Sequence, residues 1–137
     1  MQTIMAVGAA IIRKRTDGKV ELFVAERGHG DLEGFFEYPG GKIEPGEEPK
    51  NTAVREIREE FKAEIEVDRY IDTVDYDYPN FHLNMQVFLC HLKPREKLTL
   101  TEHTSSKWVT AEELDQVKFA PADATLVEKM KQVIGEI

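Results

Sequence analysis

Hydrophobic and polar residues alternate along several stretches of this 137-residue chain with the two-residue period of half-buried β-strands. Clusters of glycine, proline, asparagine and aspartate separate these stretches and favour turns. Residues 16–18 carry the aspartate and glycine of a hairpin turn, and the three glycines of 28–34 predict a mobile loop at the rim of a pocket. The pattern predicts strands at residues 5–14, 20–27, 63–74 (with a bend), 82–92 and 105–109, a turn at 75–80, and short extended pieces at 35–38 and 98–102.

Two other stretches carry apolar residues at helical spacing. Residues 49–61 mostly tolerate or favour helix, and the proline at position 49 suits a first helical turn because its missing N–H has no helical partner there. Residues 122–134 form a second amphipathic pattern near the C-terminal end. Between them, Thr110 and Glu113 have the spacing of a capping box, which predicts the start of a short helix.

Composition narrows the class of protein. The chain is 41% hydrophobic and 32% charged, which is typical of a globular protein, and it has neither a bilayer-length apolar run nor a signal-peptide pattern. We therefore expect a cytoplasmic protein without a membrane partner. A net charge of −8 without a basic stripe argues against binding to a nucleic-acid polymer. The single cysteine, Cys90, lies in an apolar run and is predicted to be a core residue. Because no repeat, low-complexity segment or linker is present, residues 1–137 are predicted to form one domain.

The helix predicted at 49–61 carries acidic and apolar residues on different faces. On a helical wheel, Glu56, Glu59 and Glu60 share an arc about a third of a turn from the apolar stripe. These glutamates repel one another, and Arg55, four residues before Glu59, offsets only part of the repulsion. A hard divalent cation such as Mg²⁺ would offset more, because it prefers oxygen ligands. The alternative is a solvated acidic face. The apolar stripe consists of Ala53, Val54, Ile57 and Phe61.

The loop before this helix changes the balance between those two interpretations. Together with the helix it fits the Nudix box, Gly-x5-Glu-x7-Arg-Glu-U-x-Glu-Glu-x-Gly-U, where U is aliphatic. Only Lys62 departs from the box, at its closing glycine, which leaves the geometry of the helix end open. The chain resembles the Nudix family over nearly its whole length, which implies an α/β fold with a mixed β-sheet sandwiched between helices. The matching residues are Gly41, Glu47, Arg55, Glu56, Ile57, Glu59 and Glu60.

The resemblance implies hydrolysis of a phosphoanhydride in a nucleoside diphosphate linked to a further group. It implies Mg²⁺, with Mn²⁺ as an alternative, held by Glu56, Glu59, Glu60 and the carbonyl of Gly40. An ion pair between Glu47 and Arg55 would pin the loop to the helix, unless Arg55 is merely an exposed side chain.

Two glutamates are candidates for the general base, and the sequence does not choose between them. One is Glu56, beside the box arginine. The other is Glu102, six residues before Trp108, where related enzymes place a metal-binding glutamate; the alternative for Glu102 is an ordinary loop position. The neighbouring His103 is expected to be a polar loop residue, because a metal site of this type does not need imidazole.

A base pocket is predicted from resemblance to the MutT subgroup. Arg27 would lie beside the nucleotide, and Asp123, in a Pro-Ala-Asp segment, would accept hydrogen bonds from cytosine or from the N–H edge of guanine. Glu37, Tyr38 and Phe81 would line the same pocket. The aromatic residues could equally be plain core, and Asp123 could be an ordinary residue at a helix N-terminus.

The resemblance to the MutT subgroup implies a Mg²⁺-dependent nucleoside triphosphate pyrophosphohydrolase that releases a nucleoside monophosphate and pyrophosphate. CTP, dCTP or a modified dCTP is the first choice of substrate. An oxidised purine such as 8-oxo-dGTP is the second, and ADP-ribose or a dinucleoside polyphosphate is the third. From other classes, a non-catalytic nucleotide-sensing Nudix module and an acidic partner-binding domain stay as alternatives. Monomer and homodimer are both open.

Overall fold

A seven-stranded sheet organises the chain, and the computed structural model describes all residues from 1 to 137. Five strands follow the order β3-β2-β1-β6-β5, while β4 pairs with β1 and β7 pairs with β2. The pair β1·β6 is parallel and the other pairs are antiparallel, so the predicted mixed sheet is confirmed. The strands are β1 (Gln2–Lys14), β2 (Val20–Glu26), β3 (Phe36–Glu37), β4 (Gly40–Lys42), β5 (Ile65–Asp77), β6 (Phe81–Leu92) and β7 (Ser105–Val109).

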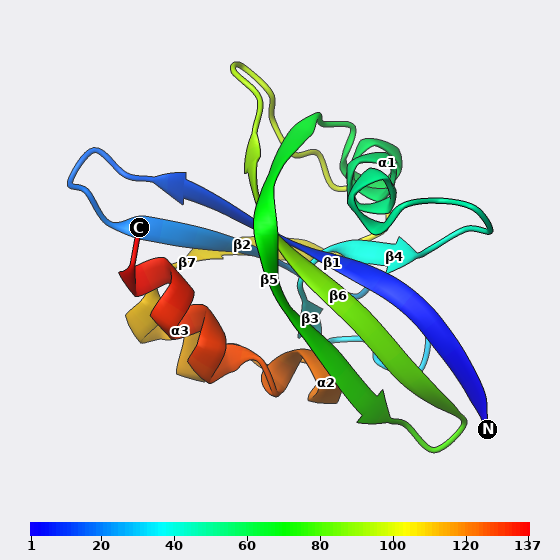
Figure 1. Cartoon of the computed structure of the whole chain (residues 1–137). Coiled ribbons are helices and arrows are strands. Elements are labelled where there is room, and N and C mark those ends of the chain that lie inside the picture. The colour runs from blue at the N-terminus through cyan, green and yellow to red at the C-terminus, as the bar shows by residue number, and fades with distance from the viewer.

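Helices cover both faces of this sheet (Figure 1). The helix α1 (Pro49–Phe61) packs on one face through a cluster of 12 buried residues that includes Ile57 and Phe61. On the other face lie η1 (Ala111–Gln116, a 3₁₀ helix), α2 (Pro121–Ala124) and α3 (Val127–Gly135), over a cluster of 19 buried residues. This arrangement is the predicted α/β/α sandwich. No helix is long and apolar enough to cross a membrane.

The two-residue period of β2 explains how one strand serves both cores. Leu22 and Val24 point into the larger cluster, whereas Phe23 and Ala25 point into the cluster beneath α1. Successive side chains of a strand face opposite sides of a sheet, so the part of β2 that is covered on both faces, residues 22–25, is apolar. All of these side chains are buried.

The first strand changes partner along its length, and this change positions the site. Near its end β1 pairs with β2, and earlier Val7 and Gly8 pair with Gly41 and Gly40 of β4. A Cβ on Gly40 would collide with the carbonyl of Val7, so only glycine permits this close approach. The glycine segment expected to be loop is therefore a short strand held against β1.

Three other sequence predictions need correction or refinement, and a fourth is confirmed. The turn predicted at 75–80 is shorter, because β5 continues to Asp77, which pairs with His82 across the hairpin. The bend expected in β5 is confirmed by two irregularities of register. The predicted terminal helix is interrupted between α2 and α3, where the hydroxyl of Thr125 donates to the carbonyl of Ala122 at 2.6 Å. Residues 98–102 form no strand.

The end of α1 resolves the question raised by Lys62. This residue adopts φ 55° and ψ 38°, the left-handed conformation that favours glycine, and its N–H donates to the carbonyl of Arg58. A side chain in this region carries a steric cost.

We expect Lys62→Gly to stabilise the protein by about 1 kcal/mol, because glycine adopts the left-handed conformation without that cost. Urea unfolding followed by circular dichroism measures the change. Lys62→Ala is the matched control, since alanine removes the same charge but keeps the strain. Equal stability of the two variants would contradict the explanation.

Candidate active site

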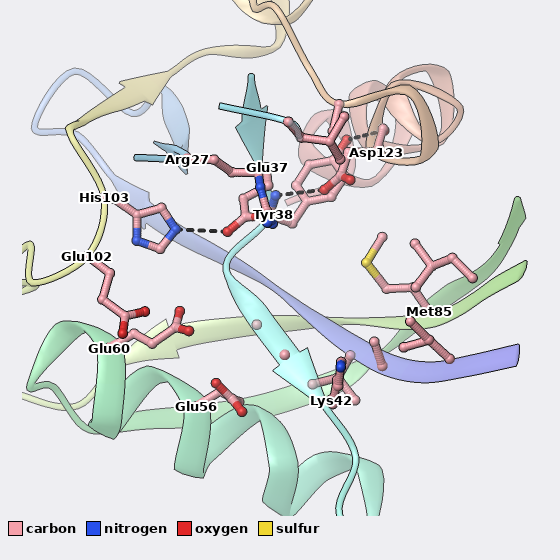
Figure 2. A pocket seen from close by; sticks show the side chains of 18 of the residues that line it. Arg27, Glu37, Tyr38, Lys42, Glu56, Glu60, Met85, Glu102, His103 and Asp123 are labelled. Atoms are coloured by element: carbon pink, nitrogen blue, oxygen red, sulfur yellow. Dashed lines mark hydrogen bonds and ion pairs between the residues drawn. The ribbon is translucent and has the colours of Figure 1, made fainter. Parts of the chain in front are cut away.

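A cavity of about 480 Å³ opens beside β3, β4 and α1 (Figure 2). Its lining comes from segments far apart in the chain, including the loop 28–34, which does form part of the rim as predicted. Most of the site residues predicted from the sequence meet here. They are Arg27, Glu37, Tyr38, Gly40, Glu56, Glu60, Phe81, Glu102 and Asp123.

One end of the cavity is acidic. Glu56 and Glu60 project from α1, and Glu102 approaches them from the loop between β6 and β7 (Figure 2). Burial raises the pKa of Glu60 to about 8, and the charges of Glu56, Glu37 and Glu102 add to the effect. Burial likewise raises the pKa of Glu56, although Arg55 opposes the shift. Carboxylates gathered in this way need a cation before they can all be ionised.

The backbone beside these carboxylates leaves room for such a cation. A Cβ on Gly41 would lie 2.6 Å from both carboxylate oxygens of Glu56, so a larger residue here would displace that carboxylate from its present position. The carboxylates of Glu56, Glu60 and Glu102, with the carbonyl of Gly40, are the hard oxygen donors that Mg²⁺ or Mn²⁺ prefers. No set of three His, Cys, Asp or Glu side chains is arranged to hold an ion in this structure, so these carboxylates would have to move closer together to bind one jointly.

Glu59 differs from the sequence prediction. Its side chain is 52% exposed and lies outside the cavity, where both oxygens accept hydrogen bonds from Nη1 of Arg55, at 3.1 and 3.2 Å. The helical wheel placed Glu59 in the same arc as Glu56 and Glu60, but it could not fix the direction of a long side chain with an arginine one turn away. The ion pair is half exposed, so turning Glu59 toward the cavity breaks only a weak interaction.

Arg55 ties the loop to the helix in the way that the sequence suggests. Its Nε and Nη2 donate to the two oxygens of Glu47 at 2.7 and 3.0 Å, and Nη2 also reaches the carbonyl of Lys42 at 3.1 Å. Hydrogen bonds from Arg55 and Thr52 lower the pKa of Glu47 to about 2. Nη1 donates to Glu56 at 3.0 Å, which links this pair to the cavity. The alternative of an exposed, unpaired arginine is therefore wrong.

The opposite end of the cavity carries groups suited to reading a base. Nη1 of Arg27 donates to Glu37 at 2.9 Å. The N–H of Tyr38 donates to Oδ2 of Asp123 at 2.9 Å, and its hydroxyl donates to the Asp123 carbonyl at 3.2 Å. Burial raises the pKa of Asp123 to about 7. The Phe81 ring packs beside Tyr78, with centroids 5.2 Å apart.

Several cavity residues were not predicted from the sequence. His103, expected to be a polar loop residue, is only 6% exposed and lines the cavity. Tyr78 lines it too, and its hydroxyl accepts the N–H of Ala122 at 3.0 Å. Lys42 and Met85 complete different parts of the wall (Figure 2). His103 and Lys42 had local signals, their positions next to Glu102 and next to Gly41, whereas Tyr78 and Met85 reach the cavity through the pairing of distant strands.

Known proteins resemble this chain in sequence and in fold. A family model described as a NUDIX domain matches residues 8–129. The chain is 31% identical to a CTP pyrophosphohydrolase of Escherichia coli (strain K12), covering 91% of this chain and 90% of that protein. It is 26% identical to an 8-oxo-dGTP diphosphatase of the same strain, covering 94% and 98%. The solution structure of the E. coli ORF135 protein superposes with a TM-score of 0.77 at 30% identity, covering 97% of this chain and 91% of that one. The chain therefore belongs to the Nudix hydrolase family.

The raised pKa of Glu60 predicts how pH affects the metal-free protein. In the unfolded chain Glu60 loses its proton near pH 4.5, but in the folded protein only near pH 8, so stability falls as pH rises between these values. In EDTA, we expect Glu60→Gln to remove this contribution and to be more stable than the parent at pH 8 by roughly 1 kcal/mol after solvent screening. Thermal melts at pH 5 and pH 8 measure the difference. Glu59→Gln, which lies outside the cavity, should not reproduce it.

Proposed function

We propose that this Nudix hydrolase cleaves nucleoside triphosphates to a nucleoside monophosphate and pyrophosphate, with Mg²⁺ as the preferred metal. The observation that carries the proposal is one cavity with a carboxylate end, formed by Glu56, Glu60 and Glu102, and a hydrogen-bonding end, formed by Glu37 and Asp123. A nucleotide has the same two-ended chemistry, a polyphosphate joined to a base. Residues 1–137 would act as a single domain.

The carboxylates would hold the metal together with the Gly40 carbonyl, and Glu59 stays in the proposed ligand set because its link to Arg55 is weak. When bound, Mg²⁺ or Mn²⁺ neutralises phosphate charge and acidifies water. Glu56 and Glu102 both lie in the cavity and both suit a general base. Arg55, held by Glu47, would keep Glu56 oriented.

The base end supports CTP, dCTP or a modified dCTP as the first choice. One oxygen of Asp123 accepts the N–H of Tyr38, and the carboxyl lines the cavity, so the other oxygen is available to a base. Cytosine offers an exocyclic amino group to such an acceptor. The pKa of Asp123 is about 7, so its carboxyl group is fully ionised, and acts only as a hydrogen-bond acceptor, above neutral pH. The similarity to a CTP pyrophosphohydrolase supports the same order.

An oxidised purine, 8-oxo-dGTP, is the second candidate. The N–H edge of guanine would also donate to Asp123, and the similarity to an 8-oxo-dGTP diphosphatase over 94% of the chain favours it. ADP-ribose and dinucleoside polyphosphates rank third. A nucleotide-sensing module without activity is disfavoured, because such modules usually lose box carboxylates and this chain keeps Glu56, Glu59 and Glu60.

Removing one cavity carboxylate should abolish most of the activity. We expect Glu60→Gln to lower kcat for CTP by roughly two orders of magnitude or more, because an electrostatic group at the phosphate end is lost. Release of pyrophosphate in Mg²⁺ and in EDTA measures this, with no release expected in EDTA. Glu128→Gln, an exposed glutamate outside the cavity, is the matched control. Full turnover by Glu60→Gln would refute the metal-binding role.

Replacing Asp123 tests how the base is read. We expect Asp123→Asn to change the ratio of kcat/KM between CTP and 8-oxo-dGTP by about tenfold, because asparagine both donates and accepts where the ionised carboxylate only accepts. A screen of normal and modified triphosphates with pyrophosphate detection gives the ratio. Asp115→Asn, at an exposed ion pair with Lys131, is the control. An unchanged ratio would remove Asp123 from base selection.

A further inference from the structure

His103 lies between the two ends of the cavity (Figure 2). Its ring stacks on Phe61, the last residue of α1, with centroids 4.9 Å apart and an interplanar angle of 23°. Its Nε2 is 2.8 Å from Oε2 of Glu37. An ionised carboxylate only accepts hydrogen bonds, so Nε2 of His103 carries a hydrogen and donates the hydrogen bond to Glu37.

This contact completes the environment of Glu37. Nη1 of Arg27 donates to Oε1 and His103 donates to Oε2, so each carboxylate oxygen has a donor. Nδ1 of His103 and Nε of Arg27 are buried without a partner. Burying a polar ring is unfavourable unless it is hydrogen-bonded, and the bond to Glu37 is the ring's one polar contact. That bond therefore fixes the orientation of the ring.

The same loop places Glu102, the residue before His103. Two contacts attach it to the end of α1: the N–H of Thr99 donates to the Phe61 carbonyl at 2.8 Å, and the hydroxyl of Thr101 donates to the Glu60 carbonyl at 2.6 Å. The loop therefore follows the C-terminal end of α1. This path brings Glu102 toward Glu60.

Beyond Glu102 the loop crosses to β2. The N–H of Thr104 donates to the carbonyl of Glu26 at 3.1 Å, and a Cβ on Gly28 would lie only 2.6 Å from the Glu102 carbonyl. The backbone around Glu102 is thus closely packed. Among the loop side chains, His103 is the one that hydrogen-bonds to β3, where Glu37 stands.

We propose that His103 is a positioning residue that holds Glu102 at the metal end and Glu37 at the base end in one fixed arrangement. The inference rests on the proposed function, which assigns those two ends. Loss of the hydrogen bond from Nε2 leaves Oε2 of Glu37 without its donor, so that Arg27 alone holds this carboxylate. It also removes the side-chain link between β3 and the loop that carries Glu102. Metal binding and nucleotide binding therefore weaken together, because His103 acts on both ends of the cavity through Glu102 and Glu37.

The test is His103→Phe, which keeps an aromatic ring on Phe61 and removes the donor to Glu37. We expect about tenfold weaker binding of Mn²⁺, measured calorimetrically without nucleotide, and about a tenfold higher KM for CTP. His103→Gln supplies an N–H donor near the position of Nε2 and should recover most of both losses. His91→Phe is the control, because His91 is an exposed histidine of β6 outside the cavity.

Wild-type binding of Mn²⁺ by His103→Phe would overturn the positioning role and leave His103 as packing only. An inactive parent enzyme that binds Mn²⁺ would instead refute the proposed function, so the two failures are distinct. If His103→Phe does not fold, nitrogen-15 NMR of the parent protein decides. We expect the His103 ring protonated at Nε2 with a slowly exchanging proton; a ring protonated only at Nδ1, or in free exchange, overturns the proposal.

Discussion

The repulsion among carboxylates that the fold brings into one cavity is the constraint on which the rest of the site depends. Glu56, Glu60 and Glu102 come from a helix and a distant loop, and burial raises the pKa of Glu56 and Glu60. Burying ionised carboxylates costs free energy, so stability alone would favour keeping these side chains exposed to water. The two buried clusters on either face of the sheet supply the stability that lets the cavity keep them together.

Arg55 and the glycine turn determine where the Glu56 carboxylate lies relative to the loop and to β1. Arg55 binds Glu47 through two hydrogen bonds and Glu56 through a third, so it balances the charge of the loop and part of the charge of Glu56, but makes no contact with Glu60 or Glu102. Gly40 and Gly41 admit no side chain between β1 and Glu56. The glycine turn can therefore lie close to both β1 and the Glu56 carboxylate, which lines the cavity.

The sequence could predict the parts of the site that depend on local spacing. Helical periodicity placed Glu56 and Glu60 on one face, and the turn residues placed a glycine segment before them. It could not predict the side-chain direction of Glu59, because an arginine at i−4 competes for the carboxylate. Nor could it predict the burial of His103, since the contact with Glu37 joins residues 66 positions apart in the chain. The interruption between α2 and α3 escaped prediction because the apolar spacing continues across it.

The same charge balance explains how an acidic protein can bind a polyanion. A net charge of −8 disfavours the approach of a triphosphate, and the cavity adds further carboxylates at the end where the phosphates would lie. Under the proposed function, binding of a triphosphate would require a cation that both partners share, so metal and nucleotide binding would be linked thermodynamically. A side chain that spans both ends, as His103 does through Glu37 and the Glu102 loop, adds a structural link to that electrostatic one. The geometry of the carboxylate end then depends on the same hydrogen bond that orients the base end.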